Sequence, residues 1–580
     1  MPSQAGSIVK QYTMDRGKIL LPHRCWPSKK FLSLALLFLL VLGGNVFALF
    51  SFFTDNTSAS ALKSAHSPQA SGQQLVVNPV SATDLFAAQQ AENTLQVFPV
   101  FSEANGEIKA KNLVKNHFFV CDDEHGPLDF SLHEHGPGQG PTLFVVGGIQ
   151  GDEPGGFSAA SLLVTHYNIT KGKLFVVPNL NFHSIVLRGR GLYGDMNRKF
   201  ATLASNDPEF DTVSKIKELL LNPKVDAILN LHDGSGFYRP SWESAMRNPA
   251  RWGQSVIIDQ ISIGANSYGQ LENIAEKVLL RTNSLLLAPD HKYFLKNTRT
   301  AEGDKEMEKT LTFFAIKNGK PAFGVEASKD FPLPVRAYYH LQVLESFMQS
   351  LGITFERNFE LTPKGVAEAL SKNLEVAFFD GHVVLPLDNV RSNLTHIPLR
   401  KHDKLNFSTT SPLLTVVHAK QNSAELEVYY GNRLLTTLRP DYLDYDHSLQ
   451  KMVIYADGQE QEVRFGETIK VSRSIKIKSV PNYRVNAIGP QLNSGGSECG
   501  ITLARDDFPS RFSLDQAGNT FRVEVYRQMP HKVDEPQGKK SVSDPFAGMI
   551  LVQFPDAART AANEELTLPA VEGKESVLGY

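Results

Sequence analysis

The chain has 580 residues, of which 42% are apolar and 21% are charged, and its formal net charge is −2. A chain of this length is too long for one hydrophobic core and is expected to form about two to four domains. The near-neutral charge supplies no basic field, so nucleic acid is excluded as an expected partner.

The first strong signal along the chain is an apolar segment at residues 31–53 that contains no charged residue. At a rise of roughly 1.5 Å per residue, the segment can cross a hydrocarbon core of roughly 30 Å. Residues 1–30 carry six Lys or Arg and one Asp, a bias that retains this end in the cytoplasm. The segment therefore predicts an uncleaved transmembrane anchor, with signal cleavage near Val46–Ala48 as the alternative. In both cases the body of the protein is exported.

Residues 54–95 are rich in Ser, Ala, Gln and Asn and are expected to form a flexible linker. From 96 to 355, strand-like and helix-like runs alternate along the chain. The strand-like runs are 143–146, 173–177, 225–231 and 322–325, and the helix-like runs are 155–166, 211–221, 271–287 and 335–349. This alternation predicts an α/β domain with a mixed sheet flanked by helices. In such sheets the functional site lies beyond the carboxyl ends of the strands.

Beyond residue 356 the pattern changes to short segments of alternating apolar and polar residues, separated by turn signals such as Asp457-Gly458. The segments are 382–385, 413–418, 425–430, 452–455, 475–477, 521–526 and 549–554. They predict two all-β modules, at 356–445 and 446–555, the second of them immunoglobulin-like. Residues 556–580 are expected to be a disordered tail.

The most informative motif is GGIQGDEPGG, from Gly147 to Gly156. It follows the apolar run TLFVV and precedes a helical pattern, so its polar residues stand at the carboxyl end of a predicted strand. Gln150 and Glu153 are three residues apart, which lets one turn direct both side chains at a single point. Because a catalytic zinc takes three protein ligands and a water, a metal site here needs a distant third ligand.

The distant candidate is His232, directly after the apolar strand-like run 225–231. A histidine in this position emerges at the carboxyl edge of the sheet, level with Gln150 and Glu153. A lone histidine there is more often a hydrogen-bonded core residue, and the motifs in the rest of the chain decide between the two roles.

Two further motifs contain charged residues that could bind or react with a substrate. Arg190 precedes Asn197-Arg198 in the segment VLRGRGLYGDMNR, and a guanidinium grips a carboxylate through two parallel charge-assisted hydrogen bonds. Glu326 ends the strand-like run 322–325. Each motif alone is weak, because a surface arginine is usually solvated and a strand-terminal glutamate is more often an ion-pair partner.

Taken in chain order, Q-x-x-E, R…NR, His and Glu, these motifs resemble the carboxypeptidase A-like (M14) zinc carboxypeptidases. The first residue departs from that family's pattern, since glutamine stands where histidine is usual. The resemblance implies a carboxypeptidase A-like fold and one Zn²⁺ per chain, with Gln150, Glu153 and His232 as metal ligands.

The same resemblance implies roles for the remaining motif residues. Glu326 corresponds to the general base, which takes a proton from the attacking water and returns it to the leaving amine. Arg190 corresponds to the residue that polarises the scissile carbonyl and stabilises the oxyanion. Asn197 and Arg198 correspond to the pair that holds the terminal carboxylate of the substrate.

Within this family, the glutamine, the segments Leu231–Pro240 and Asn248–Gln260, and the two β modules resemble the peptidoglycan DL-carboxypeptidases that determine cell shape in helical Gram-negative bacteria. The similarity covers roughly residues 100–555. It implies that the substrate is the stem tripeptide of a muramyl peptide, from which terminal meso-diaminopimelate is released from γ-D-glutamate. It also implies a periplasmic enzyme, held in the inner membrane by residues 31–53.

Two more residues are candidates for substrate binding. Trp252 could form an apolar wall against the diaminopimelate side chain, and ordinary core packing is an equal alternative. Thr312 is interpreted as a strand hydroxyl near Glu326, although a structural role is the more common one for such a residue.

Two other functions compete with the DL-carboxypeptidase. One is a deacylase of the aspartoacylase or succinylglutamate desuccinylase type, and export argues against it because those substrates are cytosolic. The other is a metal-free peptidoglycan-binding scaffold in which Gln150 marks an inactive site. Retention of Glu153, Arg198, His232 and Glu326 argues against such decay.

Overall fold

The structure is a computed structural model that describes residues 8–11, 119–121, 126–264, 266–401, 405–420, 423–491, 496–529 and 544–555. The predicted anchor (31–53), linker (54–95) and tail (556–580) lie outside these residues. Within the described ranges, no helix is both long enough and apolar enough to span a bilayer.

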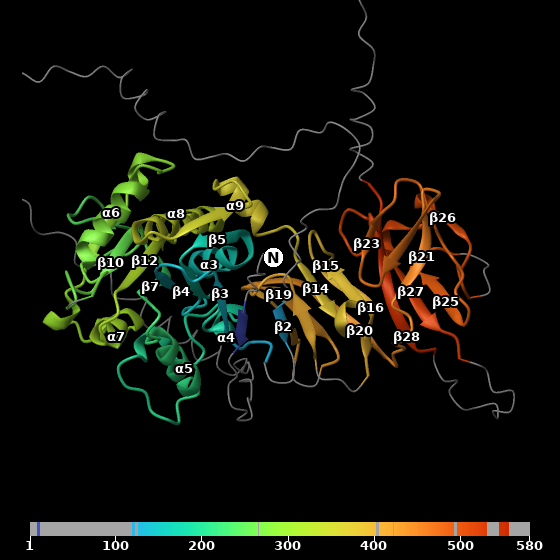
Figure 1. The fold of residues 1–580 in the computed structure, drawn as a ribbon, viewed down its shortest axis with the longest axis horizontal. Helices are drawn as coiled ribbons and strands as arrows, with labels where there is room; N and C mark the ends of the chain where they lie inside the picture. The colour runs from blue at the N-terminus through green and yellow to red at the C-terminus, as the bar shows by residue number, and fades with distance from the viewer. Residues whose placement is uncertain are drawn as a thin grey trace, which may run out of the picture. The chain divides into compact units, whose positions relative to one another are not determined.

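An eight-stranded mixed sheet forms the centre of the α/β region (Figure 1), which confirms the predicted mixed sheet. Its strand order is β1 (Ile8–Gln11), β3 (Ser131–His135), β6 (Lys173–Val177), β4 (Thr142–Val146), β7 (Ala227–Gly234), β12 (Ala322–Ser328), β10 (Ser255–Ile258) and β11 (Phe294–Asn297). The four central strands, β6, β4, β7 and β12, are parallel. Every residue of β4 is buried, as expected for a parallel strand covered on both faces.

Helices cover both faces of this sheet. On one face lie α3 (Pro154–His166), α6 (Leu271–Asn283) and α8 (Leu333–Leu351), with α8 packed against the other two. On the other face lie α4 (Phe182–Val186), α5 (Phe210–Leu220) and α7 (Leu311–Lys317). The parallel strands therefore end at one edge of the sheet, between the two helical layers, where the predicted site residues are located.

Some element boundaries differ from the sequence prediction. Helix α6 ends at Asn283 rather than near 287, because the Asn283 side chain bonds the backbone N–H and C=O of Tyr293 and fixes the exit of the chain. A helix, α9 (Pro363–Ala369), lies in the region read as all-β. The Thr362 hydroxyl caps it and Pro363 occupies its first turn, which are ordinary helix-start signals.

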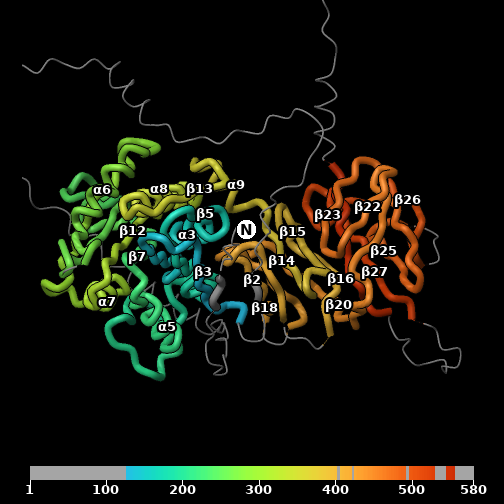
Figure 2. The backbone as a smooth tube through the Cα atoms, viewed as in Figure 1, coloured from blue at the N-terminus to red at the C-terminus, as the bar shows by residue number. Residues whose placement is uncertain are grey.

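The remainder of the described chain is rich in β-strands, as predicted, and forms two pairs of four-stranded sheets (Figure 2). The first pair comprises β15 (Val383–Pro386), β14 (Glu375–Phe378), β17 (Phe407–Thr409) and β2 (Phe119–Cys121), and β16 (Asn393–Arg400), β20 (Arg433–Leu443), β19 (Leu426–Tyr430) and β18 (Leu414–His418). The second comprises β22 (Gln459–Arg464), β21 (Lys451–Ala456), β24 (Ser474–Ile477) and β26 (Thr502–Ala504), and β23 (Thr468–Lys470), β28 (Phe546–Gln553), β27 (Thr520–Arg527) and β25 (Tyr483–Ala487). Two short two-stranded sheets lie in the α/β region. They are β5 (Tyr167–Lys171) with β13 (Thr354–Arg357), and β8 (Phe237–Tyr238) with β9 (Arg247–Asn248).

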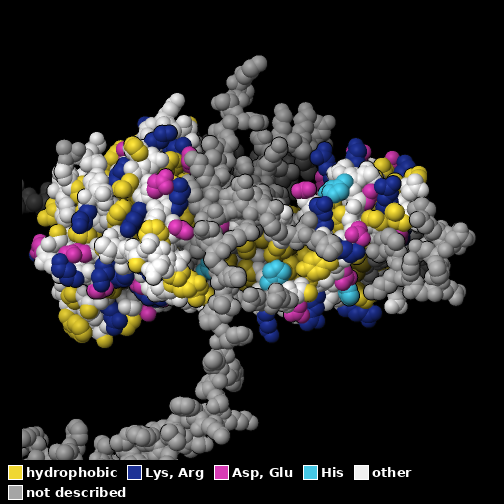
Figure 3. Space-filling model, turned by 90° about the horizontal axis from the view of Figure 1, so that it is seen from below, with side chains coloured by type: hydrophobic (Ala, Val, Ile, Leu, Met, Phe, Trp, Pro, Cys, Tyr) yellow, Lys and Arg dark blue, Asp and Glu magenta, His cyan; other side chains and the backbone are white. Residues whose placement is uncertain are grey.

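The two β modules differ in how they join the α/β region. The first shares one continuous hydrophobic core with it, and residues such as Leu414 and Val428 pack in the same cluster as Phe157. The second has a core of its own, built from both of its sheets and including Ile454 and Phe521. On the face shown in Figure 3, acidic and basic side chains are interspersed over the described surface.

Candidate active site

The loop that follows β4 places Gln150 and Glu153 at the carboxyl edge of the sheet. Its backbone adopts a positive φ of 73° at Gly148, which glycine tolerates readily. A Cβ atom at Gly151 would lie only 2.0 Å from the backbone oxygen of Ser184, so this position needs glycine as well. Helix α3 begins directly after Glu153, and both polar side chains are buried.

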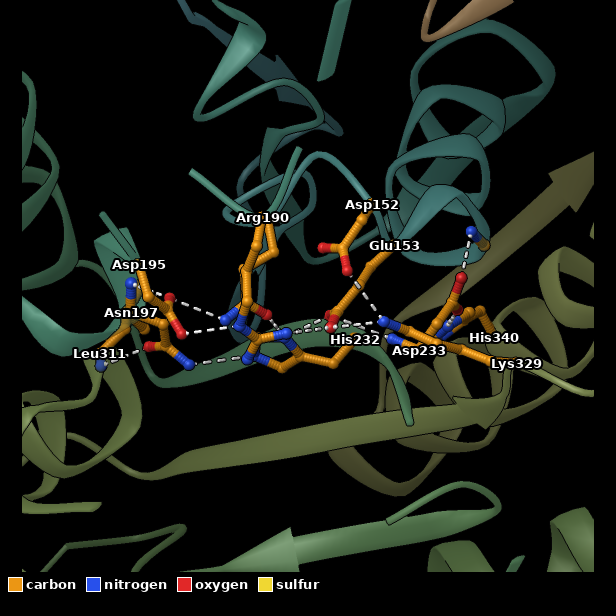
Figure 4. Close-up of polar contacts among 12 residues, drawn as sticks. Asp152, Glu153, Arg190, Asp195, Asn197, His232, Asp233, Leu311, Lys329 and His340 are labelled. Atoms are coloured by element: carbon orange, nitrogen blue, oxygen red, sulfur yellow. Dashed lines mark hydrogen bonds and ion pairs between the residues drawn. The ribbon is translucent and has the colours of Figure 1, made fainter. Parts of the chain in front are cut away.

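Three predicted metal ligands converge on one point. Nδ1 of His232 lies 3.0 Å from Oε1 of Gln150 and 2.9 Å from Oε2 of Glu153, and Figure 4 shows the histidine and the glutamate pointing toward one another. The sequence placed His232 after its strand, whereas β7 extends to Gly234 because residues 232–234 continue to pair with β12. The histidine therefore has the rigidity of a central strand.

The donor atoms fit a zinc ion. Tetrahedral zinc, with bonds of about 2.0–2.2 Å to nitrogen and oxygen, separates its donors by about 3.3–3.6 Å. The separations at His232 are a few tenths of an ångström shorter, so only a small outward movement would be needed. Among the described residues, no group of three or more His, Cys, Asp or Glu side chains is arranged for a metal. The set here differs because one of its members is a glutamine.

Asp195 fixes the orientation of the glutamine side chain. Nε2 of Gln150 donates to Oδ1 of Asp195 over 2.8 Å. An ionised carboxylate only accepts hydrogen bonds, so the amide nitrogen must face Asp195 and the amide oxygen must face His232. Asp195 has no role in the sequence-based prediction, although its place two residues before Asn197 could have suggested one.

Arg190 bridges the metal-ligand motif and Asp195. Its Nη1 lies 3.1 Å from Oε1 of Glu153, and its Nε lies 2.9 Å from Oδ2 of Asp195. About half of the arginine side chain, 48%, is exposed. The guanidinium is thus held in place on one side and open to a substrate on the other.

Asn197 and Arg198 lie in a 3₁₀ turn, η1 (Met196–Arg198), beside the same histidine. Oδ1 of Asn197 accepts from the backbone N–H of Leu311 at the start of α7, and its Nδ2 lies 3.4 Å from Nε2 of His232. Nη1 of Arg198 donates to the Asn197 carbonyl, and its Nε lies 3.6 Å from Glu306. The pair presents an amide and a partly exposed guanidinium next to the metal ligands.

Glu326 stands on β12 directly across from His232 in the parallel register. Its side chain is buried, and Oε2 has no hydrogen-bond partner in the described part of the chain. Burial raises the pKa of Glu326 to about 8; the charge of His232 opposes this rise, and the charge of Glu153 adds to it. A buried carboxyl with an unused oxygen beside a cluster of polar side chains is suited to move a proton.

The two additional substrate-binding candidates are placed differently. A Cβ atom on Gly234, at the end of β7, would contact Trp252, so this tryptophan lies near the site, and Nζ of Lys296 lies 4.2 Å from the centre of its ring. The strand assignment of Thr312 is wrong, because it lies in the first turn of α7. Its hydroxyl contacts Thr310 and Asp259.

Asp233 has no role in the sequence-based prediction, and in the structure its hydrogen bonds stabilise the elements that carry the metal ligands. It accepts hydrogen bonds from the backbone N–H of Gly155, from Arg336 and from His340, while its own backbone N–H donates to Glu153. Burial opposes ionisation, yet His340 and Arg336 hold the pKa of Asp233 below its ordinary value. Asp233 thereby ties β7 to α3 and α8.

Lys329 is a third residue without a predicted role. Its Nζ lies 3.1 Å from Oδ2 of Asp152 and 3.4 Å from Oε1 of Glu153. The position of Lys329 at the end of β12, three residues after Glu326, is the signal in the sequence that could have found it.

Comparisons with known proteins bear on both the α/β region and the last β module. A family model for the catalytic domain of carboxypeptidases controlling helical cell shape matches residues 131–371. A model for the C-terminal domain of metallo-carboxypeptidases matches residues 445–555. No curated protein sequence matches the chain significantly.

Solved structures of the cell shape determinant protein Csd4 from Helicobacter pylori are similar over most of the chain. Apo, tripeptide-bound and mDAP-bound forms each share 40% sequence identity with it, at a TM-score of 0.65. Each alignment covers 73% of this chain and 100% of the Csd4 chain. The Helicobacter pylori Csd4 protein is a D,L-carboxypeptidase.

Proposed function

The chain belongs to the family of carboxypeptidases that control helical cell shape, and on that premise we propose that it is a zinc-dependent D,L-carboxypeptidase of peptidoglycan. Its substrate is the stem tripeptide, from which it releases meso-diaminopimelate and leaves γ-D-glutamate at the new end. The solved relatives hold a tripeptide and mDAP, which supports this substrate.

One observation carries the proposal: Oε1 of Gln150 and Oε2 of Glu153 lie within 3.0 Å of Nδ1 of His232. A hydrogen bond to Asp195 selects the amide oxygen, rather than the amide nitrogen, for this cluster. Three lone-pair donors at one point form a metal site, and we assign them to one Zn²⁺ per chain.

The chain's own residues bind and orient the substrate. Asn197 and Arg198 grip the terminal carboxylate of diaminopimelate, which converts binding energy into orientation of the scissile bond. Arg190, already held by Glu153 and Asp195, directs its free side to the scissile carbonyl oxygen. A donor placed in advance at a developing oxyanion contributes roughly 3–4 kcal/mol. Trp252 offers an apolar wall to the diaminopimelate side chain, and Thr312 is retained as a binding candidate.

Glu326 moves the proton. Zinc, when bound, supplies Lewis acidity toward a water molecule and toward a carbonyl oxygen. Glu326 accepts the proton of the attacking water through its unpartnered Oε2 and returns it to the leaving amine of diaminopimelate. Its place opposite His232 in the sheet register fixes the carboxyl beside the metal ligands.

Incubation of residues 96–555, the catalytic domain with both β modules, with muramyl tripeptide tests this function. The reaction is run with and without a chelator. Release of diaminopimelate that stops on chelation and returns with zinc is the expected result. Hydrolysis of N-acyl amino acids with the tripeptide left intact would instead indicate a deacylase. A protein that takes up no zinc at saturating supply and cleaves neither substrate would indicate the metal-free scaffold.

The proposal extends to location. A peptidoglycan enzyme acts in the periplasm, and residues 31–53 are the proposed inner-membrane anchor. N-terminal sequencing of the membrane and soluble fractions decides: an intact start in the membrane supports the anchor, and a start after Ala48 supports signal cleavage.

The domain boundaries are also part of the proposal. They are 96–355 for the catalytic domain, 356–445 for the first β module and 446–555 for an immunoglobulin-like second module. The separate core of the last module and its match to a C-terminal domain model support that boundary. Limited proteolysis should release a stable fragment that begins near residue 446.

A further inference from the structure

Lys329 lies on the opposite side of the metal-ligand cluster from the carboxylate-binding pair. Nδ2 of Asn197 approaches Nε2 of His232 at 3.4 Å, whereas Nζ of Lys329 approaches Oε1 of Glu153 at 3.4 Å. Figure 4 shows Asn197 and Lys329 on opposite sides of His232. Neither the family resemblance nor the proposed mechanism gives this cation a role.

The position of Lys329 relative to a bound substrate follows from the proposed binding mode. If Asn197 and Arg198 hold the terminal carboxylate and the scissile carbonyl lies at the metal ligands, the released residue occupies the Asn197 side. The residue that precedes the scissile bond must then extend toward the opposite side. That side is where the ammonium group of Lys329 stands, beside Asp152 and Glu153.

The chemistry of a γ-glutamyl linkage gives this cation a partner. Glutamate joined through its side-chain carboxyl keeps a free α-carboxylate, which Cγ, Cβ and Cα separate from the scissile carbonyl carbon. An α-linked residue with an uncharged side chain has no such charge. We propose that Lys329 binds this α-carboxylate and thereby selects γ-D-glutamyl substrates. The inference rests on the proposed function and deepens it.

Lys329 has the capacity for this contact. An ammonium group has three N–H donors, and the two acids account for two of them. About a third of its side chain, 32%, is exposed, so a ligand can reach it. A divalent cation bound to Glu153 would neutralise that carboxylate, leaving Asp152 as the counter-charge of Lys329 and strengthening its attraction for an incoming anion.

Two substrates and three variants test the inference. The substrates are L-Ala-γ-D-Glu-meso-diaminopimelate and the same tripeptide with the α-carboxylate of glutamate converted to an amide. The variants are Lys329→Gln, Lys329→Arg and, as a matched control, Lys224→Gln. Lys224 is an exposed lysine that precedes β7, at the amino end of that strand.

Loss of one charge-assisted hydrogen bond costs about 10- to 100-fold in kcat/KM. The zinc-loaded wild type and Lys224→Gln are expected to prefer the acid substrate over the amide by this factor. In Lys329→Gln, kcat/KM for the acid substrate should fall by this factor, whereas kcat/KM for the amide substrate should not change. The variant should therefore cleave both substrates as slowly as the wild type cleaves the amide. Lys329→Arg should keep much of the preference, because the charge remains.

A second readout separates substrate binding from support of the metal site. In a Glu326→Gln background, calorimetry should show the same acid-over-amide preference in Kd, abolished by Lys329→Gln, with zinc content unchanged. Equal wild-type rates on the two substrates would overturn the inference alone. It would also be overturned if Lys329→Gln slowed both substrates equally and lost zinc, because Lys329 would then only hold Glu153. Failure of the zinc-loaded wild type to cleave either substrate would overturn the proposed function, and the inference with it.

Discussion

The α/β region and the last β module both bury charged side chains, yet they use them differently. In the last module, Arg522 pairs with Glu524 at 3.3 Å, and its guanidinium also donates to the backbone oxygens of Thr395 and His396 in β16 of the neighbouring module. In the α/β region, Glu153 receives contacts from His232, Arg190 and Lys329 around one point.

The difference teaches that a buried charge does not by itself identify a site. Arg522 satisfies backbone carbonyls and joins two modules, which is a structural use. Around Glu153, the partners are side chains from separate loops and strands, and Glu326 nearby retains an unpartnered oxygen. Convergence of side chains from separate loops and strands on one point distinguishes the catalytic edge from the module interface. An unused polar atom does not, because Nε of Arg522 and Oε1 of Glu524 are also buried without a hydrogen-bond partner in the described part of the chain.

The sharpest test of this contrast is Glu326→Gln. Removal of the proton carrier should lower kcat for the tripeptide by about 10²- to 10⁴-fold. Folding should be little affected, because burial raises the pKa of Glu326 to about 8, so the carboxyl is already mostly neutral near pH 7 and glutamine is a neutral isostere. Steady-state kinetics and thermal unfolding of the same samples measure both effects. Retained kcat would remove Glu326 from the mechanism.

Arg522→Met should give the opposite outcome. Leaving Glu524 buried without its partner destabilises the last module by about 3–5 kcal/mol, while kcat on the tripeptide should stay unchanged. Denaturant unfolding, monitored through hydrogen exchange in β27, measures this loss of stability. The double variant Arg522→Met/Glu524→Leu should recover much of the stability, because no unpaired charge then remains. A fall in kcat in Arg522→Met would show that the two regions are coupled.

Asp195→Asn should weaken zinc binding by about 10- to 100-fold, as is typical for residues that orient metal ligands. The asparagine amide can either donate or accept, so it no longer selects the amide oxygen of Gln150 for the metal. Competition with a chromophoric chelator measures the affinity, with Asp207→Asn as the control for an acid that pairs with Lys199 outside the site. Equal affinities in wild type and Asp195→Asn would contradict the orienting role.

The two regions should also respond oppositely to pH. Burial lowers the pKa of His133 to about 3, and the charge of His135 adds to this effect. Between about pH 6.5 and 3, His133 is therefore protonated in the unfolded chain and neutral in the folded one. The α/β region loses stability as pH falls through that window. Burial raises the pKa of Glu524, so its contribution is present at low pH and is lost as pH rises. Hydrogen exchange should show acid-induced opening in β3 and not in β27, and His133→Gln should reduce it.

The sequence was informative where function and chain order coincide. Gln150, Glu153, His232 and Glu326 could be named for two reasons. Their order along the chain resembles that of the zinc carboxypeptidases, and polar residues that follow apolar strand-like runs meet at one sheet edge. The mixed sheet and the β-rich modules followed from the change in hydrophobic period. The fold predictions depend only on local pattern and on the general geometry of parallel strands, whereas the roles of the site residues depend also on the family resemblance.

The roles of other residues depend on contacts that no local pattern carries. Asp195 meets Gln150 across 45 positions of sequence, and Lys329 meets Asp152 across 177. Thr312 lies in a short helix rather than on the predicted strand, because the Thr310 hydroxyl caps the start of α7. Long-range pairing and capping therefore account for what the sequence analysis missed.

The central claim is that a glutamine, a glutamate and a histidine hold one zinc ion. Anomalous diffraction from crystals of the zinc-loaded protein, recorded on both sides of the zinc absorption edge, tests it directly. The expected result is one strong peak per chain, bonded to Oε1 of Gln150, Oε2 of Glu153 and Nδ1 of His232. A zinc-saturated crystal with no peak among these three atoms would contradict the account.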